Sequence, residues 1–174
     1  MAEAIRRYLA YYIGDIVYGA NDGIITTFAV ISGAAGAGFS STVIIVLGIA
    51  NLIADGFSMG ASKYLSLRSE QSLTAARSRT RSPMGDGLAT FISFVVAGTL
   101  PLIPFFVPAA AEHAFVVSCV ATAATLFFVG SARSFVIKRN PFVAGFEMLA
   151  VGGIAATIAF GLGAFVQMLI GQFS

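Results

Sequence analysis

Long apolar segments, separated by short polar ones, dominate the pattern along this chain. Segments of about 20 apolar residues recur, and an α-helix of that length can cross the hydrocarbon core of a bilayer. The pattern predicts five transmembrane helices, over residues 13–35, 42–65, 87–108, 114–134 and 143–171. We therefore expect an all-α membrane protein in which residues 1–174 form a single transmembrane domain.

The connections between the predicted helices differ in composition. The first, GAAGAGFSST, is a turn rich in glycine and serine, and the second, over 66–86, is polar and basic. The third predicted helix ends in PLIPFFVPAAAEH, whose three prolines disfavour a straight helix.

Composition supports the membrane class. Hydrophobic residues make up 57% of the chain and charged residues 10%, against roughly 25% charged residues in soluble domains. The first apolar segment contains Asp15 and Asp22 and lacks a small-residue cleavage site, so we expect it to be retained rather than removed as a signal peptide. The single cysteine, Cys119, excludes an intrachain disulfide, and we expect it to pack in its apolar helix.

The basic residues predict the orientation of the chain in the membrane. All ten lie before the first predicted helix or around the second and fourth connections: Arg6, Arg7, Lys63, Arg68, Arg77, Arg79, Arg81, Arg133, Lys138 and Arg139. The positive-inside rule then places the N-terminus in the cytosol and the C-terminus outside. We interpret TAARSRTRS in the second connection as a determinant of topology, with binding of anionic lipid head groups as the alternative. Nothing in it indicates nucleic-acid binding.

The acidic residues fall into groups by position. Four lie at ends or in connections, where ordinary surface charges are expected: Glu3, Glu70, Asp86 and Glu112. Asp22, Asp55 and Glu147 lie inside predicted helices, where a charge in hydrocarbon is costly and therefore indicates function. Asp15 and Glu147 both lie near the cytosolic side, and each is a candidate cytosolic entrance or proton relay. For Glu147 a capping or interhelical contact is the alternative.

Two predicted helices carry residues that suit a metal ion. Asp15 and Asp22 are seven residues apart and share one face of the first helix. Asn51, Asp55 and Met59 follow at i, i+4 and i+8 on the second helix, in a stripe about 80° wide. Oxygen ligands suit Mg²⁺, Ca²⁺ and Mn²⁺, whereas a thioether favours softer ions. The set predicts a site for a borderline divalent ion such as Fe²⁺, with Mn²⁺, Co²⁺ and Zn²⁺ as alternatives.

The spacing alone leaves three interpretations open. The first is metal transport, in which the carboxylates bind protons when the metal is absent. The second is proton-coupled transport of a non-metal solute. The third is a non-transporting membrane assembly subunit, in which buried aspartates hold helices together and Met59 fills the core. We expect no enzyme, because no nucleophile–base pair or cofactor motif is present, and no permanently bound cofactor.

Two segments together resemble one known family. DIVYGANDGIITTFAVISGAAGA, followed by GIANLIADGFSMGASKYLSLRSEQ, resembles the first two helices of the vacuolar iron transporter family. The resemblance implies a five-helix domain that forms homodimers and exports Fe²⁺ and related divalent ions from the cytosol in exchange for protons. It also implies a path between the subunits, lined by the first two helices. Carried over by position, Asp22 and Met59 are residues of that path.

The chain departs from the family pattern in two places. A position often occupied by glutamate, eight residues before the methionine, is Asn51 here, and from helical geometry Asp55 could supply the missing charge. Well-studied members also carry an acidic cytosolic metal-binding domain between the second and third helices, for which 66–86 is too short and too basic. We expect a short form of the family, in a bacterial inner membrane. Its expected path ligands are Asp22, Asn51, Asp55 and Met59, with coupling protons on the two aspartates.

Overall fold

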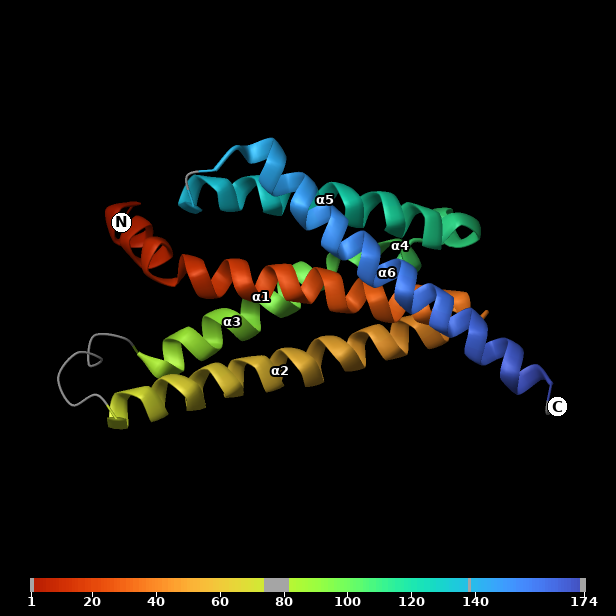
Figure 1. The fold of residues 1–174 in the computed structure, drawn as a ribbon, viewed down its shortest axis with the longest axis horizontal. Helices are drawn as coiled ribbons and strands as arrows, with labels where there is room; N and C mark the ends of the chain where they lie inside the picture. The colour runs from red at the N-terminus through yellow and green to blue at the C-terminus, as the bar shows by residue number, and fades with distance from the viewer. Residues whose placement is uncertain (1, 74–81, 138, 173–174) are drawn as a thin grey trace.

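The fold consists of long helices joined by short connections (Figure 1). The computed structural model describes residues 2–73, 82–137 and 139–172. The five long helices in this part of the chain are α1 (Ala2–Gly36), α2 (Ser41–Leu73), α3 (Pro83–Gly98), α5 (Ala114–Ile137) and α6 (Pro141–Gly171). The prediction of an all-α protein with five long helices is therefore confirmed.

The connection between α3 and α5 is broken at its prolines. It consists of the 3₁₀ turn η1 (Leu100–Leu102), the short helix α4 (Ile103–Phe106) and the 3₁₀ segment η2 (Pro108–His113). Each of these segments has a proline in its first two positions, where the missing backbone N–H leaves no hydrogen bond unmade. The third predicted span, 87–108, is therefore bent, as its prolines indicate.

Helix α1 occupies the centre of the bundle. It packs against α2, α3, α5 and α6, and Figure 1 shows α2 and α3 on one side of it and α5 and α6 on the other. Most of the contacts that hold the bundle together therefore involve α1.

Glycines allow α1 to approach its neighbours closely. A Cβ atom at Gly23 would collide with the backbone carbonyl of Phe94 on α3, and one at Gly36 would collide with that of Phe160 on α6. Small residues at helix interfaces in membranes let backbones come near enough for strong van der Waals packing. The glycines of α1 thus fix its distance from the helices on both sides.

Two apolar clusters fill the space around α1. One joins α1, α2 and α3 through Phe28, Leu52 and Phe94. The other joins α1, α5 and α6 through Ile24, Leu126 and Met148, which are 0%, 2% and 4% exposed.

Four helical segments are long and apolar enough to cross a membrane, counted over the described residues. They are Ser41–Leu73, Pro83–Phe106, Ala114–Ser134 and Pro141–Gly171. The protein is therefore an integral, multi-pass membrane protein. Helix α1 is not among the four, because Asp15, Asn21 and Asp22 lower its mean hydropathy. A fifth span formed by α1 stays a prediction.

The polar stretch 66–86 is more helical than predicted. Helix α2 continues to Leu73, and α3 already begins at Pro83, where the Ser82 hydroxyl accepts a hydrogen bond from the Gly85 N–H at 3.2 Å. Of the charged residues named in the sequence analysis, Arg77, Arg79, Arg81 and Lys138 lie outside the described part of the chain. The structure does not describe the side chains of Glu3, Arg6 and Arg7.

The expectation that Asp86 is an ordinary surface charge is wrong. Asp86 lies in the first turn of α3 and is 0% exposed. Its neighbour Gly87 packs directly on the backbone of Gly60 in α2, so the two helices close over this turn. A helix N-terminus favours a carboxylate, which is consistent with its position. Glu70 and Glu112 are exposed, as expected.

We predict that Gly23→Ala destabilises the bundle. The new methyl group would overlap the Phe94 carbonyl, and overpacking of this kind costs about 1–3 kcal/mol. The measurement is the thermal unfolding midpoint of the purified protein in detergent. The control is Gly153→Ala on α6, where a Cβ meets nothing within 4 Å; it should be neutral or stabilising. Equal effects of both changes would contradict close packing at Gly23.

Candidate metal site between α1 and α2

Asp22 lies where α1 faces α2. It is partly buried, and its backbone carbonyl accepts a hydrogen bond from the Thr26 hydroxyl at 2.8 Å. That bond uses the backbone and not the carboxylate. The Asp22 carboxylate lies close enough to that of Asp55 on α2 for the two negative charges to interact. The structure therefore brings together two carboxylates that are 33 residues apart in the chain.

The remaining predicted ligands follow the turns of α2. Asn51 lies one turn before Asp55 and Met59 one turn after it, and all three are partly buried. The Asn51 side-chain nitrogen is buried and has no hydrogen-bond partner among the described residues. Met59 packs against the apolar cluster of α1, α2 and α3. Three of the four predicted ligands thus follow one side of α2, and the fourth, Asp22, lies on α1.

The stripe of predicted ligands follows the edge of the packed face of α2. The packed face consists of Gly48, Leu52, Gly56 and Gly60, each buried. The far side of the packed face, about 160° around the helix from the predicted ligands, exposes large apolar side chains: Ile49, Ile53 and Phe57 are 46%, 53% and 69% exposed in the single chain. Lipid or another protein covers that apolar side of α2 in the membrane.

One chain supplies only part of a usual ligand set. Among the described residues, no group of three or more His, Cys, Asp or Glu side chains could hold a metal ion. The candidate site has two carboxylates, one amide and one thioether. Oxygen ligands of this kind bind hard divalent ions, and the sulfur adds affinity for softer ones.

Asp15 forms an ion pair at one end of the same helix contact. Its carboxylate lies 2.7 Å from the ammonium nitrogen of Lys63 on α2, and the two side chains are 4% and 29% exposed. Lys63 follows Met59 by one helical turn. The pair therefore ties α1 to α2 just beyond the candidate ligands. The sequence analysis did not predict this ion pair, although Lys63 lies on the same face of α2 as Asp55 and Met59.

Glu147 lies on the other side of α1, at the contact between α5 and α6. Its carboxylate is 3.5 Å from Arg133 and 3.4 Å from Arg139. A cavity of about 410 Å³ next to this pair is also lined by Asn21 of α1. Glu147 thus has the interhelical contact that the sequence left as an alternative. Its role as an entrance or proton relay stays a prediction, as does that of Asp15.

Comparison with known proteins identifies the family. A model of the VIT family matches residues 13–82 and 72–164. This chain belongs to the VIT family. The resemblance that the first two helices indicate is therefore confirmed, and it extends across the later helices. A family of transporters also points away from an enzyme.

Relatives that match most of the chain have low identity to it. A vacuolar iron transporter of Toxoplasma gondii is 25% identical over 92% of this chain and 76% of its own length. Vacuolar iron transporter 1 of Arabidopsis thaliana is 25% identical over 89% of this chain and 86% of its own length. A shorter match, to a Plasmodium falciparum vacuolar iron transporter, is 42% identical over 64 residues. The chain is shorter than these VIT proteins.

We predict that Lys63→Met destabilises this protein. The change keeps an apolar stem but removes the cation beside the buried Asp15 carboxylate. Breaking a buried ion pair is costly, and partial exposure of Lys63 reduces the expected loss to about 2 kcal/mol. Thermal unfolding in detergent measures it.

The matched control for this pair is Arg68→Met on the same helix. Arg68 is exposed and contacts Tyr64, so its loss should change stability by less than about 0.5 kcal/mol. Adding Asp15→Asn to Lys63→Met should recover part of the lost stability. If Lys63→Met is as harmless as Arg68→Met, the pair does not hold α1 to α2.

Proposed function

We propose that this protein exports divalent metal ions, Fe²⁺ foremost, from the cytosol in exchange for protons. Mn²⁺, Co²⁺ and Zn²⁺ are alternative substrates. The ion would bind Asp22, Asn51, Asp55 and Met59 on its way across the membrane. The observation that carries the proposal is the placement of Asp22 on α1 and Asp55 on α2 such that the negative charge of one carboxylate acts on the other. Relatives that are named vacuolar iron transporters support the choice of iron.

The carboxylate pair suggests how metal and proton movement are coupled. Two negative charges close together in a medium of low dielectric repel each other strongly. A divalent cation can neutralise both of them, and protons can do the same when the cation has left. Metal binding must then release protons from the ligands. Exchange of one for the other follows from sharing the same two groups.

A homodimer would complete the site. One chain provides two carboxylates, and a two-fold axis beside α1 and α2 would add the same residues from a second copy. Ala50, Ala54 and Ser58, each of which directly precedes a predicted ligand on α2, are exposed in the single chain, which suits a surface covered by that copy. The ion path would then run between the two subunits.

The arrangement of the helices supports the proposed orientation. Figure 1 shows the N-terminus, the end of α2 with the start of α3, and the α5–α6 connection at one end of the bundle, and the C-terminus at the other. Among the described residues, Lys63 and Arg68 lie in the last part of α2, and Arg133 and Arg139 lie at the α5–α6 connection. By the positive-inside rule this end would face the cytosol, with five helices crossing the membrane.

We also propose that this is a short form of the family without a cytosolic metal-binding domain. The alignment with the Toxoplasma gondii relative spans 229 positions, more than the 174 residues of this chain, because it contains gaps. Only residues 74–82 separate α2 from α3. The bacterial inner membrane stays a prediction, since the relatives above come from a plant and from parasites.

We predict that Asp22→Asn and Asp55→Asn each abolish metal transport. Each change removes one of the two charges that neutralise the cation. The loss should exceed the roughly 10- to 100-fold effect of changing residues that only support metal ligands. The measurement is Fe²⁺ uptake into proteoliposomes that contain a metal-sensing dye, with a pH step across the membrane.

The control is Glu112→Gln, which removes an exposed carboxylate outside the helices of the site and should leave uptake unchanged. Normal uptake by Asp55→Asn would remove Asp55 from the site. No uptake by the unmodified protein with any ion or gradient would favour a non-transporting assembly subunit.

We predict that Met59→Leu changes the preference among metals. Leucine retains the apolar contact of Met59 with the core but lacks the thioether, which favours softer ions. Fe²⁺, Co²⁺ and Zn²⁺ uptake should fall relative to Mn²⁺ uptake in the same proteoliposomes. An equal fall for all ions would show that Met59 acts through packing rather than as a ligand.

A further inference from the structure

Two cavities lie between α1, α5 and α6. The helices α5 and α6 lie on the side of α1 away from α2 (Figure 1). The outer cavity has a volume of about 450 Å³ and is lined by Phe28 and Ser32 of α1, Cys119 and Thr122 of α5 and several residues of α6. The inner cavity, of about 410 Å³, is the one lined by Asn21, Arg133 and Glu147. The metal site proposed above uses neither cavity.

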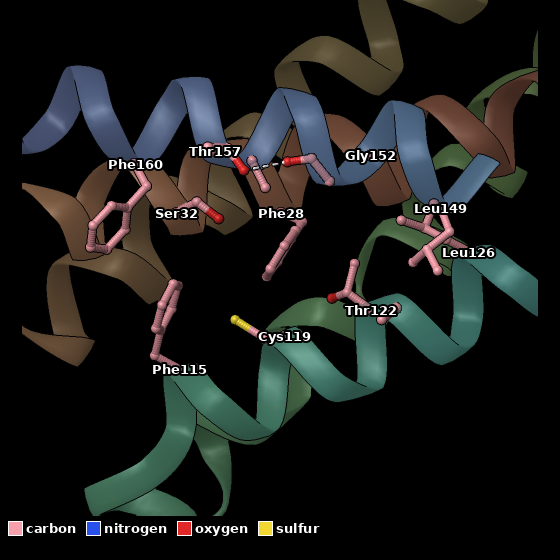
Figure 2. A pocket seen from close by; sticks show the side chains of 13 residues that line it. Phe28, Ser32, Phe115, Cys119, Thr122, Leu126, Leu149, Gly152, Thr157 and Phe160 are labelled. Atoms are coloured by element: carbon pink, nitrogen blue, oxygen red, sulfur yellow. Dashed lines mark hydrogen bonds between the residues drawn. The ribbon is translucent and has the colours of Figure 1, made fainter. Parts of the chain in front are cut away.

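The outer cavity contains buried hydroxyl groups without partners. Ser32 and Thr122 are each 1% exposed, and neither hydroxyl has a hydrogen-bond partner among the described residues. Figure 2 shows both hydroxyls and the Cys119 sulfur directed into the space between the helices. Thr125, on the same helix as Thr122, satisfies its hydroxyl locally by donating to the Ala121 carbonyl at 2.8 Å. A buried hydroxyl without a partner is unfavourable, so the cavity calls for an occupant that forms hydrogen bonds.

The inner cavity has the same property. The Asn21 side-chain oxygen and the Arg133 Nε are buried and without partners among the described residues. Glu147 pairs with Arg133 and Arg139 at this cavity. Asn21 directly precedes Asp22 in α1, so this cavity reaches the residue next to the proposed metal ligand.

An apolar barrier separates the two cavities. Leu126 lines the outer cavity and Met148 lines the inner one, and both pack with Ile24 in one buried cluster. The two cavities are therefore consecutive along the same three helices, with the buried cluster of Ile24, Leu126 and Met148 between them.

Water fits both cavities better than lipid does. A water molecule occupies about 30 Å³ and needs two to four polar partners, which the hydroxyls, the amide and the guanidinium supply. A lipid chain would fill the space but leave those groups unpaired. A metal ion is not suited to the outer cavity, because the residues that line it include no carboxylate.

We propose that the two cavities are water-filled halves of a proton pathway inside each subunit, separate from the metal site between α1 and α2. Protons move along water and the hydroxyls of Ser32 and Thr122, cross the Ile24–Leu126–Met148 barrier when it opens, and leave along the inner cavity beside Asn21. This inference rests on the proposed exchange of metal for protons: Asp22 and Asp55 bind the protons that the metal displaces, and the two cavities carry those protons to and from the carboxylates.

The first test uses Cys119, the only cysteine in the chain. In proteoliposomes, a small charged methanethiosulfonate, which reacts in water, should modify Cys119. The combined change Ser32→Ala and Thr122→Val should slow this reaction about tenfold by removing the groups that hold water. The control is Thr125→Val on the same helix, which lines a different cavity and should not alter the rate. Reaction only with a membrane-soluble maleimide, or with neither reagent, would overturn the proposal.

The second test separates proton movement from metal binding. With a pH-sensitive dye in the same vesicles, Ser32→Ala with Thr122→Val should reduce metal-driven proton flux about tenfold, while Fe²⁺ binding to the purified protein stays unchanged. Thr125→Val should match the unmodified protein. Unchanged proton flux, or an equal loss of metal binding, would overturn the proposed proton pathway. A protein that moves neither ion would refute the proposed function instead, while the Cys119 reaction would still report on the water.

Discussion

The cost of a charge in hydrocarbon is the constraint on which this structure depends. Asp15, Asn21 and Asp22 make α1 too polar to face lipid, and α1 is the helix that the other four long helices surround. Glycines bring those helices close enough to cover it. Each polar residue of α1 then has a particular environment: Asp15 pairs with Lys63, Asp22 faces Asp55, and Asn21 borders a cavity. The central position of α1 thus lets its polar residues lie inside the membrane domain without facing lipid.

The two sides of α1 offer different chemistry. Toward α2, carboxylates, an amide and a thioether suit a divalent cation. Toward α5 and α6, hydroxyls without partners suit water. Asn21 and Asp22 are adjacent in the chain yet face these two sides, because successive residues of a helix point about 100° apart. A single helix can therefore carry a metal site and a separate polar cavity at similar depth, which is a physical basis for exchanging one ion against another.

Much of the fold and part of the site could be predicted from the sequence. The spacing of apolar residues predicts five long helices, and the prolines after Thr99 predict the bend. The stripe of Asn51, Asp55 and Met59 follows from helical periodicity alone. The pairing of Asp15 with Lys63 could not be predicted, because the sequence explains Lys63 as one of the basic residues that set the orientation and gives no reason to pair it with an acidic residue of another helix. The prediction that Asp86 is a surface charge was wrong for two reasons. Helix α3 begins at its Ser82 cap, which puts Asp86 in the first turn, and Gly60 and Gly87 let α2 and α3 pack closely enough to bury that turn.

By itself, the sequence determined the membrane class, the number of long helices, the family and the helix faces on which polar residues lie. These properties depend on composition and on local periodicity, which act along one segment at a time. Only the tertiary structure decided that the charge of Asp55 acts on Asp22, that Asp15 pairs with Lys63, and that Ser32 and Thr122 share one cavity. Those pairings depend on how far each helix is rotated and how closely glycines let it approach, and both are properties of packed helices rather than of any one of them.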